Sequence, residues 1–163
     1  LEARIAALEA GYPDSLYDAL PRLVVHGDYH PGNVLVDRDR VCGIYDLDWA
    51  TLQPRVLDLA DGLFLFAGRR RSRIDPADIV SLTQSWEPDP PRWRRFVDAY
   101  LEEESVSDDE WEALLPTVRA RWLFCRIGGS VKVAPERRAA FVADGLAAPL
   151  RALERIPEAA WRL

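Results

Sequence analysis

The stretch VHGDYHPGNVLVDRDRVCGIYDLD, residues 25–48, decides how the rest of this chain is interpreted. It places Asp28, then Asn33 five residues later, and then Asp46 at the end of a second apolar run. A carboxylate can take up a proton, and carboxylate and carboxamide oxygens suit a magnesium ion that keeps some of its water. We therefore treat this stretch as a candidate active site.

Two strand-like runs lie inside the same stretch. Residues 33–36 and 41–45 are apolar or β-branched, and the polar tetrapeptide 37–40 joins them. A four-residue polar connection between two such runs favours a β-hairpin. The hairpin would return the chain so that Asp46 lies near Asn33, which is what a shared metal ion requires.

The spacing of Asp28 and Asn33 resembles the catalytic loop of protein kinases, where the Asp takes the acceptor's proton and the Asn holds magnesium. Asp46 stands where a kinase carries its other metal-binding Asp. The transition state of phosphoryl transfer is rich in charge, so the protein must orient a hydroxyl and hold the metal. The resemblance implies that Asp28 is the catalytic base and that Asn33 and Asp46 are magnesium ligands.

A closer resemblance rests on three motifs, HGDYHPGNVLV (26–36), IYDLDWA (44–50) and LDLA (57–60). In this order and spacing they resemble the aminoglycoside phosphotransferase and choline kinase superfamily. The resemblance implies an α+β, mostly helical fold: the C-terminal lobe of a protein-kinase-like fold with a small β-hairpin at the catalytic loop. It also implies a small-molecule kinase that uses Mg²⁺ and ATP, or GTP, to phosphorylate a hydroxyl of an aminoglycoside-like, amino-alcohol or sugar-derived compound.

Four further residues receive roles from these resemblances. Asp48 is either a ligand of a second metal ion or a side chain that braces the ligands. His30 occupies the place of a phosphate-contacting Lys in protein kinases and is a candidate contact to the γ-phosphate. His26 is expected to hold the loop through hydrogen bonds of its ring, and Asp58 is expected to brace the backbone of the catalytic loop.

The composition bounds the class of protein. The 163 residues are 48% hydrophobic and 29% charged, with a net charge of −6, which argues against general nucleic-acid binding. We find neither a membrane-spanning apolar run nor a signal peptide, and we expect a cytoplasmic protein. Cys42 and Cys125 lie in apolar segments, so we expect two buried free thiols, Cys42 in the core, rather than a disulfide.

The domain interpretation is a single kinase-like C-terminal lobe over residues 1–163, with the catalytic loop and metal site in 24–60 and a helical subdomain in 75–163. The chain has no methionine, and its first residues (1–10) fit a helix. No Gly-rich loop and no strand-borne Lys precede His26. We expect that the N-terminal nucleotide-binding lobe is missing, that the isolated chain is inactive, and that its exposed, apolar lobe interface is a candidate surface for a homodimer.

We expect helices to supply most of the hydrophobic core. Residues 54–67 are apolar on nearly every side and predict a buried central helix, with Asp58 and Asp61 three residues apart on it. Residues 107–110 spell a capping box at the start of a later helix. Tryptophans at helical spacing after residue 89 are expected in the core, with an acceptor pocket as their alternative role.

Two other functions stay open. A relative of protein serine/threonine kinases would share the same loop, but we find neither an Ala-Pro-Glu segment nor an activation loop after Asp46. A non-catalytic binding module that keeps the kinase shape would tolerate the loss of Asp28, Asn33 or Asp46, and all three are present.

Overall fold

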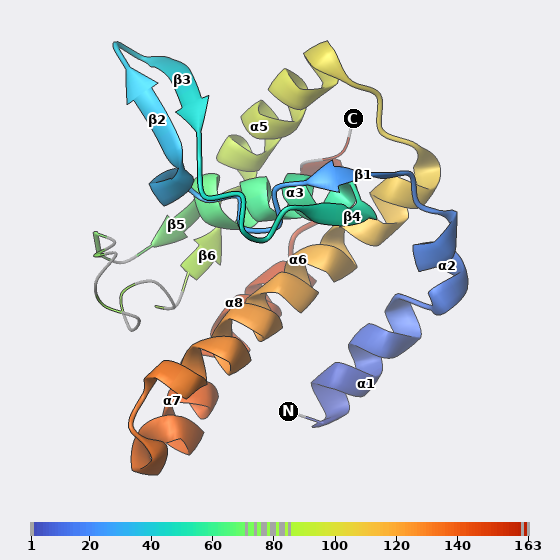
Figure 1. The fold of residues 1–163 in the computed structure, drawn as a ribbon. Coiled ribbons are helices and arrows are strands. Elements are labelled where there is room, and N and C mark those ends of the chain that lie inside the picture. The colour runs from blue at the N-terminus through green and yellow to red at the C-terminus, as the bar shows by residue number, and fades with distance from the viewer. Residues whose placement is uncertain are drawn as a thin grey trace.

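The computed structural model describes residues 2–70, 72, 73, 75, 78, 81, 84, 86–160 and 162. This part of the chain is mostly helical, and its strands form three separate two-stranded antiparallel sheets (Figure 1). The helices are α1 (Glu2–Gly11), α2 (Asp14–Ala19), α3 (Val56–Asp61), α5 (Pro90–Glu103), α6 (Asp108–Gly129), α7 (Arg138–Ala143) and α8 (Ala147–Glu154). Single 3₁₀ turns cover Pro31–Asn33, Ser130–Lys132, Pro135–Arg137 and Glu158–Ala160.

The predicted α+β, mostly helical architecture with a hairpin at the catalytic loop is confirmed. Leu1, which we expected in the first helix, lies outside the described residues, as do several positions of the predicted helical subdomain 75–163.

Two of the sheets bring distant parts of the sequence to one place. The strand pairs are β1 (Arg22–Val25) with β4 (Thr51–Pro54), β2 (Val34–Asp37) with β3 (Arg40–Ile44), and β5 (Gly68–Arg70) with β6 (Trp86–Pro88). In the first pair Val25 opposes Thr51, and in the second Val34 opposes Ile44. The segments 26–33 and 45–50 therefore run between the same two ladders and lie next to each other.

The central apolar segment begins two residues later than predicted. Pro54 ends β4 opposite Arg22, where its missing N–H is tolerated, and helix α3 starts at Val56. A π-helical turn (Gly62–Phe66) continues α3, with the Ala67 N–H donating to the Gly62 carbonyl at 3.1 Å. Burial of this segment is confirmed. Its buried hydrophobic residues are Val56, Leu59, Ala60, Leu63, Phe64 and Ala67.

Large aromatic side chains fill the core between this segment and the later helices. The Trp86 ring lies 5.0 Å from Phe64, 6.5 Å from Trp93 and 6.2 Å from Trp122, measured between ring centroids. The Trp122 indole N–H donates to the Leu146 carbonyl at 3.1 Å, which satisfies its one polar atom. The expectation that the described tryptophans of the helical half are core residues is confirmed for Trp93, Trp111 and Trp122.

Helix α6 crosses the whole molecule beside α3 (Figure 1). The predicted capping box is confirmed, because Ser107 N–H donates to Glu110 Oε2 at 2.9 Å and Glu110 N–H donates to Ser107 Oγ at 3.3 Å. None of the described helices, α6 included, is both long and apolar enough to cross a bilayer.

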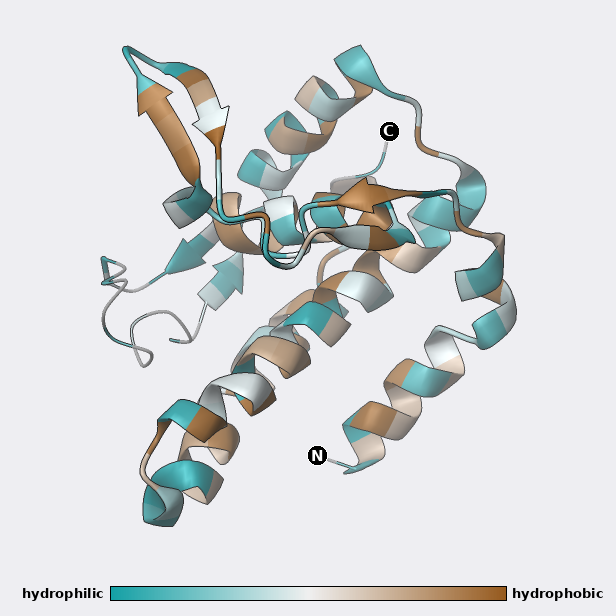
Figure 2. Cartoon of the chain, viewed as in Figure 1, coloured by the Kyte–Doolittle hydropathy of each residue, from teal (hydrophilic) through white to brown (hydrophobic). Residues whose placement is uncertain are grey.

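The β2–β3 hairpin projects from the body (Figure 2), and most of its apolar side chains are exposed. These exposed residues are Leu35, Val36, Val41 and Ile44. The prediction that Cys42 is buried in the core is therefore wrong: it is exposed, because β3 pairs only with β2 and no described layer covers the hairpin. The absence of a disulfide is confirmed, since Cys42 and Cys125 are both free thiols.

Candidate active site

His26 ties the two neighbouring segments together. Its Nδ1 accepts the Asp28 backbone N–H at 3.3 Å, and its Nε2 lies 3.0 Å from the Tyr45 carbonyl oxygen. Because Nδ1 accepts, the proton must sit on Nε2, and Nε2–H donates to Tyr45. The buried ring thus fixes the residue before Asp46 relative to Asp28.

Asp28 is half-buried and surrounded by groups that favour its charged form. The Asn33 carboxamide N–H₂ donates to the Asp28 backbone carbonyl at 3.0 Å and reaches its Oδ2 at 3.5 Å. His30 Nε2 lies 3.5 Å from the same Oδ2. The hydrogen bond from His30 lowers the pKa of Asp28 below its ordinary value, against the opposing effect of burial. Asp28 is therefore ionised at neutral pH and able to accept a proton.

His30 has one ring nitrogen committed to the backbone. Its Nδ1 accepts the Gly32 N–H at 2.9 Å, which caps the 3₁₀ turn that leads to Asn33. The proton is again on Nε2, the atom that faces Asp28. In this arrangement His30 offers a single N–H to the site.

Asn33 contacts both the proposed base, Asp28, and the residue before the proposed metal ligand Asp46. It is only 4% exposed, and its backbone carbonyl accepts the Tyr45 N–H at 3.1 Å. Its carboxamide oxygen has no hydrogen-bond donor among the described residues, so that oxygen remains available as a ligand. The register of the hairpin places Asn33 opposite Tyr45, and Asp46 follows Tyr45 directly in the chain.

Asp46 and Asp48 present carboxylates to solvent. Both are exposed, and neither carboxylate has a partner among the residues that the structure describes. Asp46 adopts a left-handed backbone with φ of 64°, a conformation that is sparsely populated outside glycine and often found at functional sites.

This donor set suits magnesium. Within the described part of the chain, no three His, Cys, Asp or Glu side chains are grouped so as to hold a metal ion on their own. Magnesium does not need such a cage, because it binds through one or two carboxylates together with water and phosphate oxygens. The free carboxamide oxygen of Asn33 and the unpartnered carboxylate of Asp46 fit that requirement.

Asp58 holds the loop through two hydrogen bonds to its backbone. Its Oδ2 accepts the His26 backbone N–H at 2.8 Å, and its Oδ1 accepts the Gly27 N–H at 3.2 Å. Gly27 has a φ of +77°, and a Cβ there would lie 2.4 Å from the Trp49 carbonyl oxygen. The loop therefore approaches the 45–50 segment more closely than any other residue type would allow.

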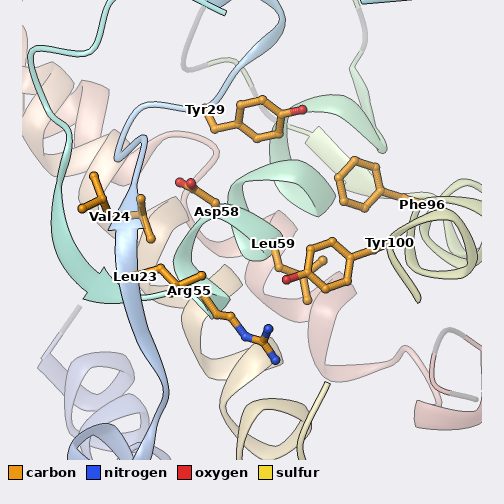
Figure 3. Close-up of a pocket in the computed structure, with 9 residues that line it drawn as sticks. Leu23, Val24, Tyr29, Arg55, Asp58, Leu59, Phe96 and Tyr100 are labelled. Atoms are coloured by element: carbon orange, nitrogen blue, oxygen red, sulfur yellow. The ribbon is translucent and has the colours of Figure 1, made fainter. Parts of the chain in front are cut away.

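A cavity of about 270 Å³ borders the loop on the side of β1 and α5 (Figure 3). Its walls include the catalytic-loop residue Tyr29 and the carboxylate of Asp58, and helix α5 contributes Phe96 and Tyr100. The remaining lining residues are Leu23, Val24, Val25, Arg55 and Leu59. The walls are mostly apolar and aromatic with a few polar groups, and the volume lies just below the roughly 300–1,000 Å³ that is usual for a small-molecule site.

Three residues of this region have no role in the sequence-based interpretation. Tyr45 bonds to the loop through its N–H, its carbonyl and its hydroxyl, which donates to the Gly32 carbonyl. Asp61 and Arg121 form an ion pair under the loop, with Nε–Oδ1 at 2.6 Å and Nη2–Oδ2 at 2.9 Å. Burial raises the pKa of Asp61 to about 6, although Arg121 opposes this. The signal for the pair was a carboxylate on an apolar helix, which needs a partner.

Comparison with known proteins agrees with the geometry. The model of a family described as the phosphotransferase enzyme family matches residues 1–96, which include every residue of the candidate site apart from Tyr100 and Arg121. Searches of curated proteins and of solved structures gave no match.

Proposed function

This chain belongs to the phosphotransferase enzyme family, and from that premise we propose that it moves the γ-phosphate of ATP or GTP to a hydroxyl of a small molecule. The acceptor class that the sequence resemblance implies is an aminoglycoside-like, amino-alcohol or sugar-derived compound. The observation that carries the proposal is the place of Asn33, whose side chain contacts Asp28 while its backbone contacts the residue before Asp46.

Asp28 is the proposed general base. Its lowered pKa keeps it ionised, so it accepts the proton as the acceptor oxygen forms its bond to the γ-phosphorus. The bond between that phosphorus and the bridging oxygen breaks, and the nucleoside diphosphate leaves with the electron pair. The products are the nucleoside diphosphate, the phosphorylated acceptor and a proton, which is first held by Asp28 and then released to solvent.

Asn33 and Asp46 are the proposed magnesium ligands, with Asp48 either at a second metal ion or bracing the first. A magnesium ion held there would neutralise the charge of the phosphate oxygens. The N–H on His30 Nε2, which faces Asp28 in the structure, is the proposed donor to the γ-phosphate and would have to be shared between Asp28 and the phosphate. His26 and Asp58 are proposed to hold the loop, through the hydrogen bonds described above.

We also propose that the chain acts as the C-terminal lobe of a larger kinase-like protein in the cytoplasm. A Gly-rich loop and a lysine for the nucleotide would come from an N-terminal lobe, and the proposed contact surface is residues 1–10 together with the exposed apolar hairpin. Without that lobe, residues 1–163 should bind Mg-ATP poorly, show no turnover, and associate with a second copy. Calorimetric titration with Mg-ATP and sedimentation of residues 1–163 test these points, and micromolar binding would contradict the first.

The direct test of the function uses the full-length protein. It is incubated with Mg-ATP or Mg-GTP and a panel of hydroxyl-bearing small molecules, and phosphate transfer is followed by ³¹P NMR. The matched variants are Asp28→Asn and, as the control, Asp37→Asn at the exposed end of β2. Loss of a general base lowers kcat by about 10²- to 10⁴-fold, with little change in the KM for nucleotide. Turnover by Asp28→Asn equal to that of the control would refute the assignment.

A further inference from the structure

The ion pair between Asp61 and Arg121 is buried directly beneath the catalytic loop. The Asp61 side chain is 0% exposed and the Arg121 side chain 12% exposed. The pair joins α3 to α6 through both carboxylate oxygens. The exposed ring of Phe124, one turn further along α6, lies 5.2 Å from the guanidinium carbon.

Arg121 has a further contact that this ion pair does not require. Its Nη2 also donates to the Gly27 carbonyl at 3.2 Å. That carbonyl belongs to the peptide group between Gly27 and Asp28, whose N–H donates to His26 Nδ1. The peptide from which the Asp28 side chain extends is therefore held at both ends, at its oxygen by Arg121 and at its nitrogen by His26.

The two carboxylates of α3 act on different backbone groups of Gly27. Asp58 accepts the Gly27 N–H directly, whereas Asp61 acts on the Gly27 carbonyl through Arg121. Because glycine has no Cβ, its peptide groups rotate more easily than those of other residues. Contacts to both groups of Gly27 are what fixes the direction of the next residue.

Stability alone does not account for this arrangement. Replacing a buried ion pair by apolar side chains of similar volume is often neutral or stabilising, because both charges have lost their water. An apolar pair would lose the directed hydrogen bond that the guanidinium fork makes to the Gly27 carbonyl. That contact therefore needs an explanation other than stability.

We infer that Arg121, held by Asp61, is a positioning residue that orients Asp28 through the Gly27–Asp28 peptide. The inference rests on the proposed role of Asp28 as the base. It predicts that loss of Arg121 lowers kcat and leaves the KM for nucleotide nearly unchanged, since misplacement of a catalytic group by about 1 Å costs roughly 10²-fold in rate.

The test compares variants of the full-length protein. Arg121→Met leaves Asp61 buried without a partner, so the main variant is the pair Asp61→Leu/Arg121→Met, which removes both charges. Arg121→Lys restores a charge opposite Asp61 but lacks the fork. The control is Arg126→Met on the same helix, because the Arg126 guanidinium donates to the Asp144 carbonyl and stacks on Phe141, outside the loop.

Three measurements are made on each variant: kcat and KM, hydrogen exchange of the Gly27 and Asp28 amides, and the unfolding temperature. For the double variant we expect an unfolding temperature near that of the unchanged protein, a kcat lowered by about 10- to 100-fold, and faster exchange at both amides. For Arg121→Lys we expect an unfolding temperature near that of the unchanged protein and a kcat as low as that of the double variant. For Arg126→Met we expect neither change at the loop.

The exchange measurement separates this inference from the proposed function. If the unchanged protein transfers no phosphate, the proposed function fails, and the exchange rates still show whether Arg121 holds the loop. A double variant with unchanged kcat in an active enzyme, or with unchanged exchange at both amides, would overturn the inference.

Discussion

Tyr45 and His26 lie nineteen residues apart in the sequence and are joined by a hydrogen bond of 3.0 Å between His26 Nε2 and the Tyr45 carbonyl oxygen. The same imidazole accepts the Asp28 N–H at its other nitrogen. One ring therefore sets the distance between the proposed base and the segment that carries the proposed metal ligand Asp46.

His26→Phe should break both contacts while keeping a buried ring. We expect kcat to fall by about 10- to 100-fold, the cost of removing a side chain that orients site residues. Tyr45→Phe removes only the contact of the hydroxyl to Gly32 and serves as the milder control. Steady-state kinetics of the full-length protein check this, and equal effects of the two variants would contradict the bridging role of the ring.

The contact between His30 and Asp28 predicts a pH dependence. The folded protein lowers the pKa of Asp28, so the stabilisation from its ionised form is present above the ordinary carboxyl pKa and is lost as the pH falls through the folded value. His30→Ala removes the main cause, and the pKa of Asp28 should rise toward its ordinary value. The acid limb of kcat/KM should then move to higher pH.

Carbon NMR of the Asp28 carboxyl measures the same change without reference to activity. An unchanged titration of Asp28 in His30→Ala would show that the histidine does not hold the carboxylate.

Gly27→Ala tests the close approach of the two segments. A left-handed conformation costs a residue with a Cβ roughly 1–2 kcal/mol, and here the Cβ would also lie 2.4 Å from the Trp49 carbonyl oxygen. We expect a loss of at least that size in the free energy of unfolding. In Gly128→Ala the new Cβ meets nothing within 4 Å, so this helical control should gain up to about 1 kcal/mol. Denaturant unfolding measures both changes.

The sequence predicted the parts of the site that depend on local order. These parts are the spacing from Asp28 to Asn33, the two strand-like runs and the capping box at Ser107. Each involves neighbours in the chain, and the structure contains the hairpin and the capping box. Asp58 was placed by family resemblance, and in the structure its carboxylate accepts the backbone N–H groups of His26 and Gly27.

Contacts between distant segments were not predictable in the same way. Arg121 follows Gly27 by ninety-four positions, and the packing of α6 on α3 decides which of its arginines meets the loop. The prediction that Cys42 is buried was wrong for a related reason. An apolar strand is buried only when another layer covers it, and the described part of the chain supplies none for this hairpin.

Variants of Asp46 can separate the role of its carboxylate in metal binding from the role of its residue type in the backbone conformation. Its φ of 64° is tolerated by Asn and Asp better than by other residues with a Cβ. Asp46→Asn and Asp46→Ala both lack the carboxylate, so both should weaken binding of the Mg-nucleotide in the full-length protein. The loss should be at least the roughly 10-fold seen when a mere supporting residue of a metal site is removed.

The two variants should differ in stability. Asp46→Asn should unfold like the unchanged protein, whereas Asp46→Ala should lose about 1 kcal/mol, because alanine meets the full cost of the left-handed conformation. Calorimetric titration gives the binding constants, and thermal unfolding without nucleotide gives the stabilities. If both variants bound Mg-nucleotide normally, Asp46 would not be a metal ligand; if they were equally stable, its backbone conformation would not be under strain.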